Sequence, residues 1–339
     1  MSKKHGTLAV QYRPQDFSDL CEQESIVNIL QYQIDEDCPK NAYLFTGPAG
    51  CGKTTSARIL ANALNKGKGM PIEKDAARHN GVDKIRTIID EAGFQSLDSK
   101  YKIFIIDEAH MITTEGWNAM LKILEEPPKN TIFIFCTTDP QKIIPTVLSR
   151  VQRFDFQRIT LKTIIQRLKY ILEQENLKDY DDEAIEFIAR MANGGMRDAI
   201  SLLEKCIDYQ PKITVDSVIE ALGYIDYDVL SDIVLALKNK EAGTVIEIIE
   251  KLYMSGVEIK FLVKQLLSFV LDLCTYSNLK NFNFINVPSA FKDKMDYLTD
   301  NCSSAPVELL KELIQLDGSL RYETNPKLLV ESTMVVLCN

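Results

Sequence analysis

The chain has 339 residues, of which 45% are hydrophobic and 26% are charged. Its length is sufficient for more than one domain, because single cores usually stop growing at about 250 to 300 residues, and its composition excludes a disordered or fibrous chain. The 39 Lys and Arg residues and the 48 Asp and Glu residues give a net charge of -9, which argues against a globally basic nucleic-acid binder but allows a local basic face.

The sequence contains no stretch of roughly 18 to 20 consecutive apolar residues, the length that a membrane-spanning helix needs. Its start also lacks an apolar run of signal-peptide length, so we expect a cytoplasmic protein without a membrane partner. The eight cysteines include no C-x-x-C pair, which argues against a zinc ribbon and against a disulfide framework. We therefore expect reduced thiols.

The first part of the chain alternates short apolar runs with amphipathic segments, a pattern typical of a parallel sheet covered by helices. Three runs that are nearly continuous in β-branched or aromatic residues predict buried strands, at residues 42–46, 102–107 and 131–137. Helical spacing begins at Thr54 and again at Glu115. The fold class of this part is therefore α/β.

From about residue 160 the strand pattern fades and helical periodicity replaces it. The predicted helices cover residues 161–175, 181–194, 195–207, 228–239, 243–256, 259–274, 306–320 and 326–337. We predict three domains: an α/β domain at residues 1–159, a small helical domain at 160–223 and an all-α C-terminal domain at 224–339.

The segment between the first predicted strand and the following helix fits the phosphate-loop pattern G-x-x-x-x-G-K-[ST]. Glycines let backbone N–H groups converge on phosphate oxygens, and the helix presents its positive end. Lys53 is expected to reach the β and γ phosphates and Thr54 to hold Mg²⁺. The predicted nucleotide-binding residues here are Gly47, Pro48, Ala49, Gly50, Cys51, Gly52, Lys53, Thr54 and Thr55.

The second predicted strand ends in two carboxylates, Asp107 and Glu108. The carboxyl edge of a parallel sheet is where α/β folds bind ligands. We expect Asp107 to position Mg²⁺ and Glu108 to polarise the attacking water. Together with the phosphate loop, this pair favours an ATPase over a passive nucleotide binder.

Ordered landmarks across the first 210 residues resemble a known family. They are YRPQDF at 12–17, GPAGCGKTTSARILANALN at 47–65, IDEAHMI at 106–112, NAMLKILEEPP at 118–128, TTDPQKI at 137–143, LSR at 148–150 and GMRDAISLLEK at 195–205. The sequence is similar to the AAA+ ATPase subunits of sliding-clamp loaders, most closely the gamma/tau family of bacterial DNA polymerase III. The resemblance implies a RecA-like AAA+ domain, a helical lid and an oligomer-forming helical collar.

The resemblance also implies roles for single residues. Tyr12, Arg13 and Pro14 match a segment near adenine and ribose, for which a structural N-terminal brace is the alternative. Thr138 matches the position that senses the γ-phosphate, with Thr137 as its neighbour.

Two arginines match family positions that contact phosphate. Arg150 is similar to the arginine finger, which acts in trans on nucleotide bound by the adjacent subunit, and Arg197 matches the second sensor on the lid. Without these motifs, a surface ion pair would be the expected role of either arginine.

Three departures from the family pattern stand out. Residues 65–81 contain no cysteine, so the four-cysteine zinc module of bacterial members is missing and we predict no zinc. Glu22 and Gln23 replace a usual Gly-Gln pair, and Val151 replaces a cysteine after Arg150. The missing module and the short C-terminus suggest a trimmed gamma-type protein from a phage or a divergent bacterium, in a bacterial or phage-infected cytoplasm.

Clamp loaders hold primer-template DNA mostly through phosphates, so a few basic residues per subunit suffice. Lys122 matches a family position near DNA, and Arg78 and Arg86 are further candidates, although a solvated surface role is an equal alternative for each. Gly81 stands where a lysine is expected. Trp117 is expected to pack in the core rather than to stack on bases.

The function that this resemblance implies is an ATP-driven motor subunit that opens a sliding clamp and places it on primer-template DNA. Its cofactors would be ATP and Mg²⁺, and its partners would be further loader subunits in a ring or spiral of five. His110 completes a DEAH sequence that also occurs in helicases, but no second motor domain is recognisable. Two different functions stay open: a DNA-remodelling AAA+ ATPase of another kind, and a non-catalytic subunit that binds nucleotide as a brace.

Overall fold

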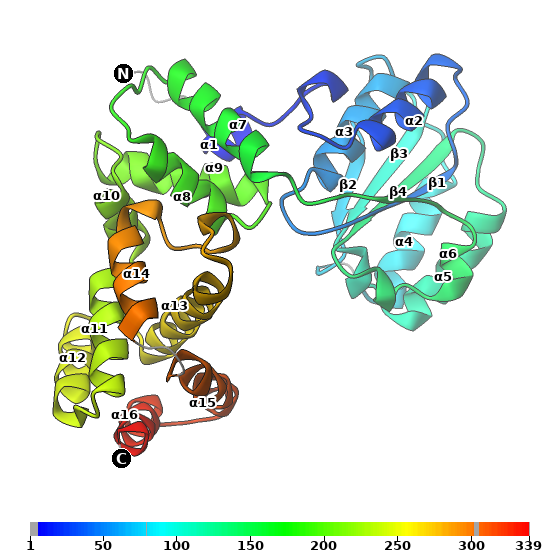
Figure 1. Ribbon diagram of the computed structural model, residues 1–339. Coiled ribbons are helices and arrows are strands. Elements are labelled where there is room, and N and C mark those ends of the chain that lie inside the picture. Colours follow the sequence, from blue (N-terminus) through cyan, green and yellow to red (C-terminus); the bar gives the residue numbers. More distant parts are fainter. Residues whose placement is uncertain (1–5, 79, 302–304, 339) are drawn as a thin grey trace. The chain divides into compact units, whose positions relative to one another are not determined.

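The computed structural model describes residues 6–78, 80–301 and 305–338. The chain divides into two compact units, the first formed by Met1–Ile171 with Ala192–Ser201 and the second by Leu172–Met191 with Leu202–Asn339. Helices α7 (Leu161–Gln174) and α9 (Met196–Tyr209) contribute to both units (Figure 1). The three-domain division at residues 159 and 223 stays a prediction.

The first unit is built on a five-stranded parallel sheet in the order β2-β3-β4-β1-β5. Its strands are β1 (Ala42–Thr46), β2 (Ile72–Asp75), β3 (Lys102–Asp107), β4 (Thr131–Thr137) and β5 (Gln152–Asp155). The three predicted strands β1, β3 and β4 are confirmed, and they form the centre of the sheet. The two edge strands β2 and β5 escaped prediction because only alternate residues are shielded from solvent, so each reads as a short polar segment.

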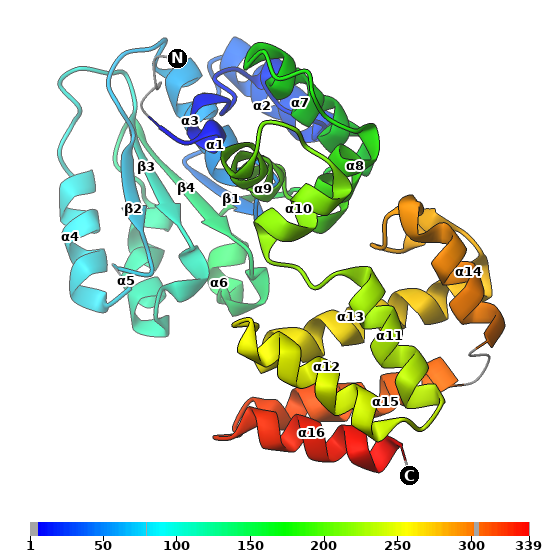
Figure 2. The same ribbon diagram turned by 90° about the vertical axis from the view of Figure 1, so that its left-hand side faces the viewer.

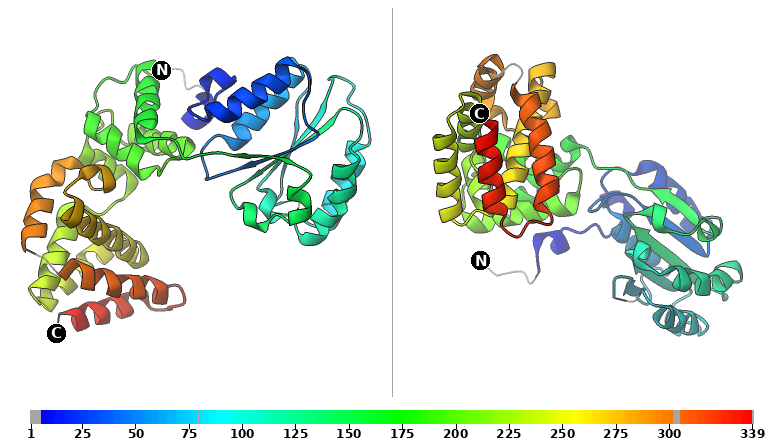
Figure 3. Two further views of the ribbon diagram at one scale, coloured as in Figure 1. Left: turned by 45° about the vertical axis from the view of Figure 1, so that its right-hand side comes forward. Right: turned by 90° about the horizontal axis from the view of Figure 1, so that it is seen from below.

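Helices cover both faces of this sheet (Figure 1 and the left view of Figure 3). Helices α2 (Glu24–Asp35) and α3 (Lys53–Leu64) pack on one face. Helices α4 (Val82–Ala92), α5 (Thr114–Glu125) and α6 (Pro145–Leu148) pack on the other. Short elements complete the unit: α1 (Leu8–Gln11) and the 3-10 turns η1 (Phe17–Asp19), η2 (Ala109–Met111) and η3 (Pro140–Lys142).

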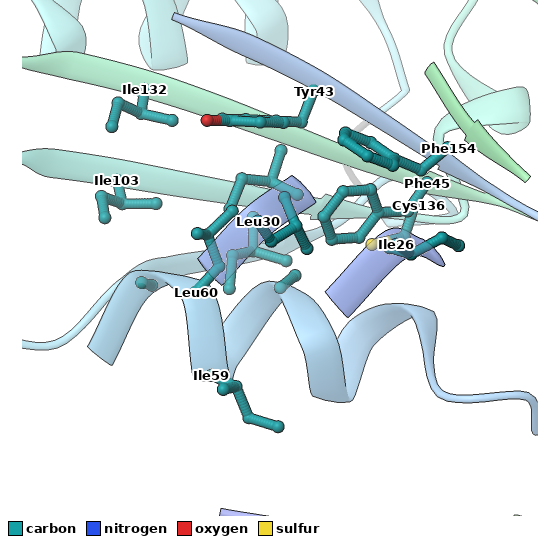
Figure 4. Close-up of a cluster of buried hydrophobic side chains, with 14 of the residues drawn as sticks. Ile26, Leu30, Tyr43, Phe45, Ile59, Leu60, Ile103, Ile132, Cys136 and Phe154 are labelled. Carbon is teal, nitrogen blue, oxygen red and sulfur yellow. The ribbon is translucent and has the colours of Figure 1, made fainter. Parts of the chain in front are cut away.

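The core on the α2 and α3 face holds the phosphate-loop strand in place. Figure 4 shows Leu30 of α2, Leu60 of α3 and Phe45 of β1 in one apolar cluster, and all three are fully buried. On the opposite face Trp117 is 1% exposed and packs with its ring centroid 5.1 Å from that of Phe135. The predicted core role of Trp117 is therefore confirmed.

In the described part of the second unit, the regular structure is helical apart from an isolated bridge between Tyr180 and Ile213. Besides the parts of α7 and α9, it contains α8 (Asp182–Met191), α10 (Val215–Leu222), α11 (Tyr227–Lys238), α12 (Ala242–Met254), α13 (Ile259–Leu279), η4 (Phe282–Phe284), η5 (Ser289–Phe291), α14 (Lys292–Asn301), α15 (Ala305–Leu320) and α16 (Pro326–Leu337). Helix α13 packs against α11, α14, α15 and α16 (Figure 2). The predicted all-α character of the C-terminal part is confirmed.

A buried carboxylate on α13 holds the loop that follows this helix. Asp272 is 5% exposed and accepts a hydrogen bond of 2.9 Å from the backbone N–H of Asn286. Arg190 of α8 donates to the carbonyl oxygen of Ile285 at 3.1 Å. Burial raises the pKa of Asp272 to about 6, although the backbone hydrogen bonds of Asn286 and Val287 oppose the shift.

Within the described residues, no helix combines the length and the apolar character needed to cross a membrane. The cysteines at 21, 38, 51, 136, 206, 274 and 338 are free thiols, as expected, and Cys302 lies outside the described residues.

Candidate nucleotide site

The loop between β1 and α3 has a backbone that depends on glycine. Gly47, Gly50 and Gly52 have φ values of 141°, 72° and 102°, in the left-handed region that favours glycine. A Cβ atom at Gly47 would lie 2.4 Å from the carbonyl oxygen of Phe156. The two glycines of the motif, Gly47 and Gly52, are therefore required by the backbone of the loop itself.

The polar groups around this loop fit a nucleotide phosphate chain with Mg²⁺. Helix α3 starts at Lys53 without a side-chain cap, so its first N–H groups face the loop unopposed by a capping oxygen. The Lys53 ammonium group donates to the carbonyl oxygens of Gly47 and Pro48 at 2.8 and 2.6 Å. The Thr54 hydroxyl donates to Oδ2 of Asp107 at 2.9 Å. This pair places hydroxyl and carboxylate oxygens, the ligand type that Mg²⁺ prefers, beside the loop.

Two thiols lie close to these groups. The Sγ atom of Cys51 donates to the Pro48 carbonyl oxygen at 2.9 Å, and burial raises the pKa of Cys51. Cys136 of β4 is fully buried, and burial raises its pKa well above the ordinary value. Both thiols therefore stay protonated at neutral pH and add no negative charge to the phosphate site.

The predicted water-polarising residue follows β3 at a sharp turn. Glu108 has φ 49° and its backbone N–H donates to Oδ1 of Asp107 at 3.0 Å. One carboxylate oxygen of Glu108, Oε2, is buried, and it finds no hydrogen-bond partner among the described residues. Thr138, after β4, is exposed, whereas the neighbouring Thr137 is 1% exposed. The sheet thus brings both candidates to its carboxyl edge.

The predicted base-side segment lines the same pocket as the phosphate loop. Tyr12, Arg13 and Pro14 border this pocket together with residues 50–55 of the loop. Gly47, Pro48 and Ala49 are not among its lining residues, although Gly47 and Pro48 hold Lys53 as described.

Sequence reasoning missed several residues of this pocket. Its remaining lining residues are Ala9, Leu20, Cys21, Ile159, Arg167, Met196 and Ile200. Arg167 of α7 donates to the Tyr12 carbonyl oxygen at 2.9 Å, and its guanidinium lies 5.1 Å from the ring centroid of Tyr170. The helical periodicity of α7 marks its apolar side only, so no local signal singles out Arg167.

The Glu22-Gln23 departure forms a polar connection between the N-terminal segment and the start of α7. Both residues have positive φ values, 59° and 66°, so the local turn tolerates the missing glycine at the expense of backbone strain. The Glu22 carboxylate accepts from the hydroxyls of Thr160 and Thr163 at 2.6 and 2.7 Å and from the Thr160 N–H at 3.2 Å. Gln23 exchanges two hydrogen bonds with the backbone of Gln157.

The predicted second sensor lies at the start of α9. Arg197 lines the pocket and is exposed. The backbone N–H of the preceding Met196 donates to the Gly50 carbonyl oxygen at 3.0 Å, which ties this helix directly to the phosphate loop. The structure therefore brings Arg197 to the pocket, as the motif suggested.

The predicted arginine finger lies elsewhere. Arg150 follows α6 and does not line the pocket of its own chain. Its Nε donates to Oε1 of Glu125 at 2.9 Å, and its Nη1 donates to the Thr146 carbonyl oxygen at 2.6 Å. The role of Arg150 as an arginine finger for an adjacent subunit stays a prediction.

The DNA candidates lie on different elements of the first unit. Lys122 is exposed on α5. Nε of Arg78 lies 3.8 Å from Oδ2 of Asp75, and 84% of the Arg78 side chain is exposed. Nη1 of Arg86, on α4, lies 3.8 Å from Oδ1 of Asp83, and 67% of the Arg86 side chain is exposed. Their role in DNA binding stays a prediction. Among residues 6–78, 80–301 and 305–338, no three His, Cys, Asp or Glu side chains form a group able to hold a metal.

Comparison with known families matches three consecutive segments of the chain. The models are "DNA polymerase III, delta subunit" at residues 70–160, "DNA polymerase III clamp loader subunit, ATPase lid domain" at residues 163–210, and "DNA polymerase III subunits gamma and tau domain III" at residues 213–309.

Similar proteins carry related names. The chain is 33% identical to DNA polymerase III subunit tau of Bacillus subtilis, over 96% of this chain and 62% of that protein. It is 34% identical to DNA polymerase III subunit gamma/tau of Mycobacterium tuberculosis, over 94% of this chain and 60% of that protein. The chain thus spans about three fifths of the length of these relatives. It is 29% identical to DNA polymerase III subunit gamma of Buchnera aphidicola, over 97% of both chains.

The fold is shared with a solved structure, the Thermotoga maritima RuvB Holliday junction branch migration motor. The TM-score is 0.53 at 19% identity, over 67% of this chain and 79% of that one. This likeness shows that the two chains share an architecture of a parallel sheet followed by helices. The three family models and the relatives from Bacillus subtilis and Mycobacterium tuberculosis show that the chain belongs to the DNA polymerase III gamma/tau family of AAA+ clamp-loader subunits.

Proposed function

We propose that the chain is an ATP-hydrolysing motor subunit of a DNA sliding-clamp loader, which opens the clamp and places it on primer-template DNA during replication. The observation that carries this proposal is the convergence of the phosphate loop, the Thr54-Asp107 pair and Glu108 at one edge of the sheet. Because the chain belongs to the gamma/tau family, we propose the clamp and the DNA as its partners.

The proposed chemistry is the hydrolysis of ATP, in which bound Mg²⁺ neutralises charge on the phosphates. Lys53 would hold the β and γ phosphates, and Thr54 with Asp107 would hold the metal. Glu108 would orient the attacking water, and the exposed hydroxyl of Thr138 would contact the γ-phosphate. Because these groups occupy fixed places at strand ends and in the first turn of α3, catalysis would rest on positioning and electrostatics.

The base and the lid would complete the site. Tyr12, Arg13 and Pro14 would border the adenine and ribose, since they line the same pocket as the loop. Arg197 would contact phosphate from the same chain, so that the position of α9 depends on the bound nucleotide.

Arg150 would act in trans on the adjacent subunit, which is the reason to propose an oligomer of five subunits in a ring or spiral with other loader subunits. The LSR motif at residues 148–150, which matches the arginine-finger position of the family, supports this assignment. Lys122, Arg78 and Arg86 are proposed to contact DNA phosphates. We propose further that no zinc is bound, since residues 65–81 have no cysteine, and that the protein works in the cytoplasm of a bacterium or an infected host.

Steady-state ATP hydrolysis by the chain, assembled with its loader partners and measured with and without clamp and primer-template DNA, tests this function. We expect the clamp and DNA together to stimulate turnover. Lys53→Ala should lower the stimulated rate at least about 100-fold, because it removes a charge that stabilises the transition state. Lys68→Ala, an exposed lysine beyond α3, is the matched control.

Two results would contradict the proposal. Confirmed ATP binding and assembly without any stimulation would favour another AAA+ remodelling role. Clamp loading that survives Lys53→Ala unchanged would favour a nucleotide that serves only as a brace.

A further inference from the structure

His110, the last residue of the DEAH sequence, has no part in the proposed chemistry so far. It is the middle residue of η2, two positions after Glu108. The left-handed conformation of Glu108, with φ 49° and ψ 42°, turns the chain so that the His110 side chain comes back beside the Glu108 carboxylate. Only 14% of the His110 side chain is exposed, so its ring is held in place by the surrounding residues.

One ring nitrogen of His110 lies between two oxygens. Nδ1 is 3.2 Å from Oγ1 of Thr137 and 3.3 Å from Oε2 of Glu108. The contact with Thr137 has the geometry of a hydrogen bond, whereas Oε2 of Glu108 is buried without such a bond among the described residues. A buried carboxylate oxygen without a partner is unfavourable, so Oε2 will take a donor that becomes available.

Thr137 connects this histidine to the turn that contains the proposed γ-phosphate contact. It is the last residue of β4, and its Oγ1 also accepts the backbone N–H of Asp139 at 3.0 Å. Thr138 lies between these two residues. A movement of this turn therefore changes the position of the Thr137 hydroxyl and its bond to His110.

We propose that His110 is a positioning residue that couples the turn at residues 137–139 to the orientation of the Glu108 carboxylate. A ring nitrogen makes one strong hydrogen bond at a time, so Nδ1 serves either Thr137 or Glu108. While Nδ1 is bonded to Thr137, no hydrogen bond holds Oε2 of Glu108, so the carboxylate is able to turn and accept a bond from the attacking water. When the turn moves away, an Nδ1–H group is released to Glu108 and holds the carboxylate. This inference rests on the proposed function of Glu108.

Matched substitutions separate this role from a general effect on packing. The side-chain amide of His110→Asn can occupy the place of Nδ1, whereas that of His110→Gln reaches the place of the other ring nitrogen. We expect His110→Gln and His110→Ala to lower kcat about tenfold at saturating ATP, with the Kd for ATP changed less than about twofold. His110→Asn should keep kcat within about threefold of the unmodified protein.

The partner residue gives a second, independent comparison. Thr137→Val removes the hydroxyl with little change in volume and should lower kcat as His110→Ala does, while Thr137→Ser should retain it. In the double variant His110→Ala with Thr137→Val, the losses should not add, because both changes remove one connection. If His110→Ala does not fold, two comparisons still test the proposed coupling: His110→Asn against His110→Gln, and Thr137→Ser against Thr137→Val.

The measurement is steady-state ATP hydrolysis at saturating ATP by the assembled loader without clamp or DNA, with the Kd for ATP determined in parallel. An unchanged kcat in His110→Gln, equal rates for the Asn and Gln variants, or full additivity with Thr137→Val would overturn the proposal. A loss that appears only in the Kd would do so as well. A complex that hydrolyses ATP but does not respond to clamp and DNA would overturn the proposed function and leave the His110 comparison valid.

Discussion

The carboxylate of Glu22 provides a prediction that can be worked from the structure. It accepts hydrogen bonds from the hydroxyls of Thr160 and Thr163 and from the backbone N–H of Thr160. These residues lie at the start of α7, where the first N–H groups of a helix favour negative charge. Glu22→Gln keeps one acceptor oxygen but removes the charge. Since bonds to a charged acceptor contribute roughly 1.5 to 3 kcal/mol and neutral ones about 1 kcal/mol, the free energy of unfolding should fall by about 1 to 2 kcal/mol.

The pH dependence of this loss has a definite sign. Burial alone would raise the pKa of Glu22, but the hydrogen bonds donated by Thr160 and Thr163 outweigh it and hold the pKa below its ordinary value of 4.5. The stabilisation is therefore present above that value and is lost as the pH falls through the lower pKa of the folded state. The difference between the Glu and Gln forms should be largest near neutral pH and should shrink below about pH 4.

Urea unfolding followed by tryptophan fluorescence measures this difference, because Trp117 is the single tryptophan of the chain and is buried in the first unit, which also contains Glu22. Glu22→Ala and Glu22→Gly form a matched pair: both remove the carboxylate, but only glycine relieves the positive φ, so the Gly variant should be about 1 kcal/mol more stable. Equal stabilities of the Glu and Gln forms at pH 7, or a difference that persists unchanged in acid, would refute the reasoning.

Two further predictions concern other parts of the chain. Burial raises the pKa of Asp272 to about 6, above its ordinary value of 3.8, so the folded state binds the proton more tightly than the unfolded state does. The free energy of unfolding should therefore rise by about 1 kcal/mol as the pH falls from 7 to 5. Asp272→Asn should remove this rise, which hydrogen exchange of the Asn286 amide can report, and an unaltered pH dependence would contradict the assignment. Arg150→Ala should lower stimulated ATP hydrolysis by the loader about 1000-fold without weakening ATP binding by its own subunit. Arg153→Ala, on the neighbouring edge strand β5, is the control. A loss of ATP binding instead would argue for a structural role of Arg150 through its contact with Glu125.

Much of the fold could be predicted because the central strands are buried on both faces. Strands β1 and β4 are buried at every position, so their sequences are continuous apolar runs that need no context to be recognised. Helices α4 and α14 were not predicted, although their apolar residues are buried, because each has only two or three buried side chains among many charged ones. In α4 the buried residues Ile85, Ile88 and Ala92 do follow helical spacing, but the many charged residues between them make the segment read as polar.

The phosphate side of the site was predictable for a related reason. The parallel sheet brings the ends of β1, β3 and β4 to one edge, and the residues that follow these strands carry the chemistry in order along the chain. Arg167 was not predictable, because its contact with Tyr12 joins segments 155 residues apart and depends on how α7 packs. Periodicity reports which side of a helix is apolar, but it does not report what a polar side chain meets on a neighbouring element.

Glu22 and His110 extend this argument to residues that lie within recognisable motifs. At position 22, the family glycine predicts only a tight turn, whereas the glutamate keeps the turn at positive φ and adds a carboxylate bound by α7. At position 110, the motif predicts a histidine beside the proposed base, but only the placement of β4 shows that its Nδ1 lies within reach of both Glu108 and Thr137. Motif residues fixed by contact with phosphate leave a local signature, since the chemistry dictates their type and spacing. The roles of Glu22 and His110 are instead set by tertiary contacts with α7 and β4, so they leave no such signature in the sequence.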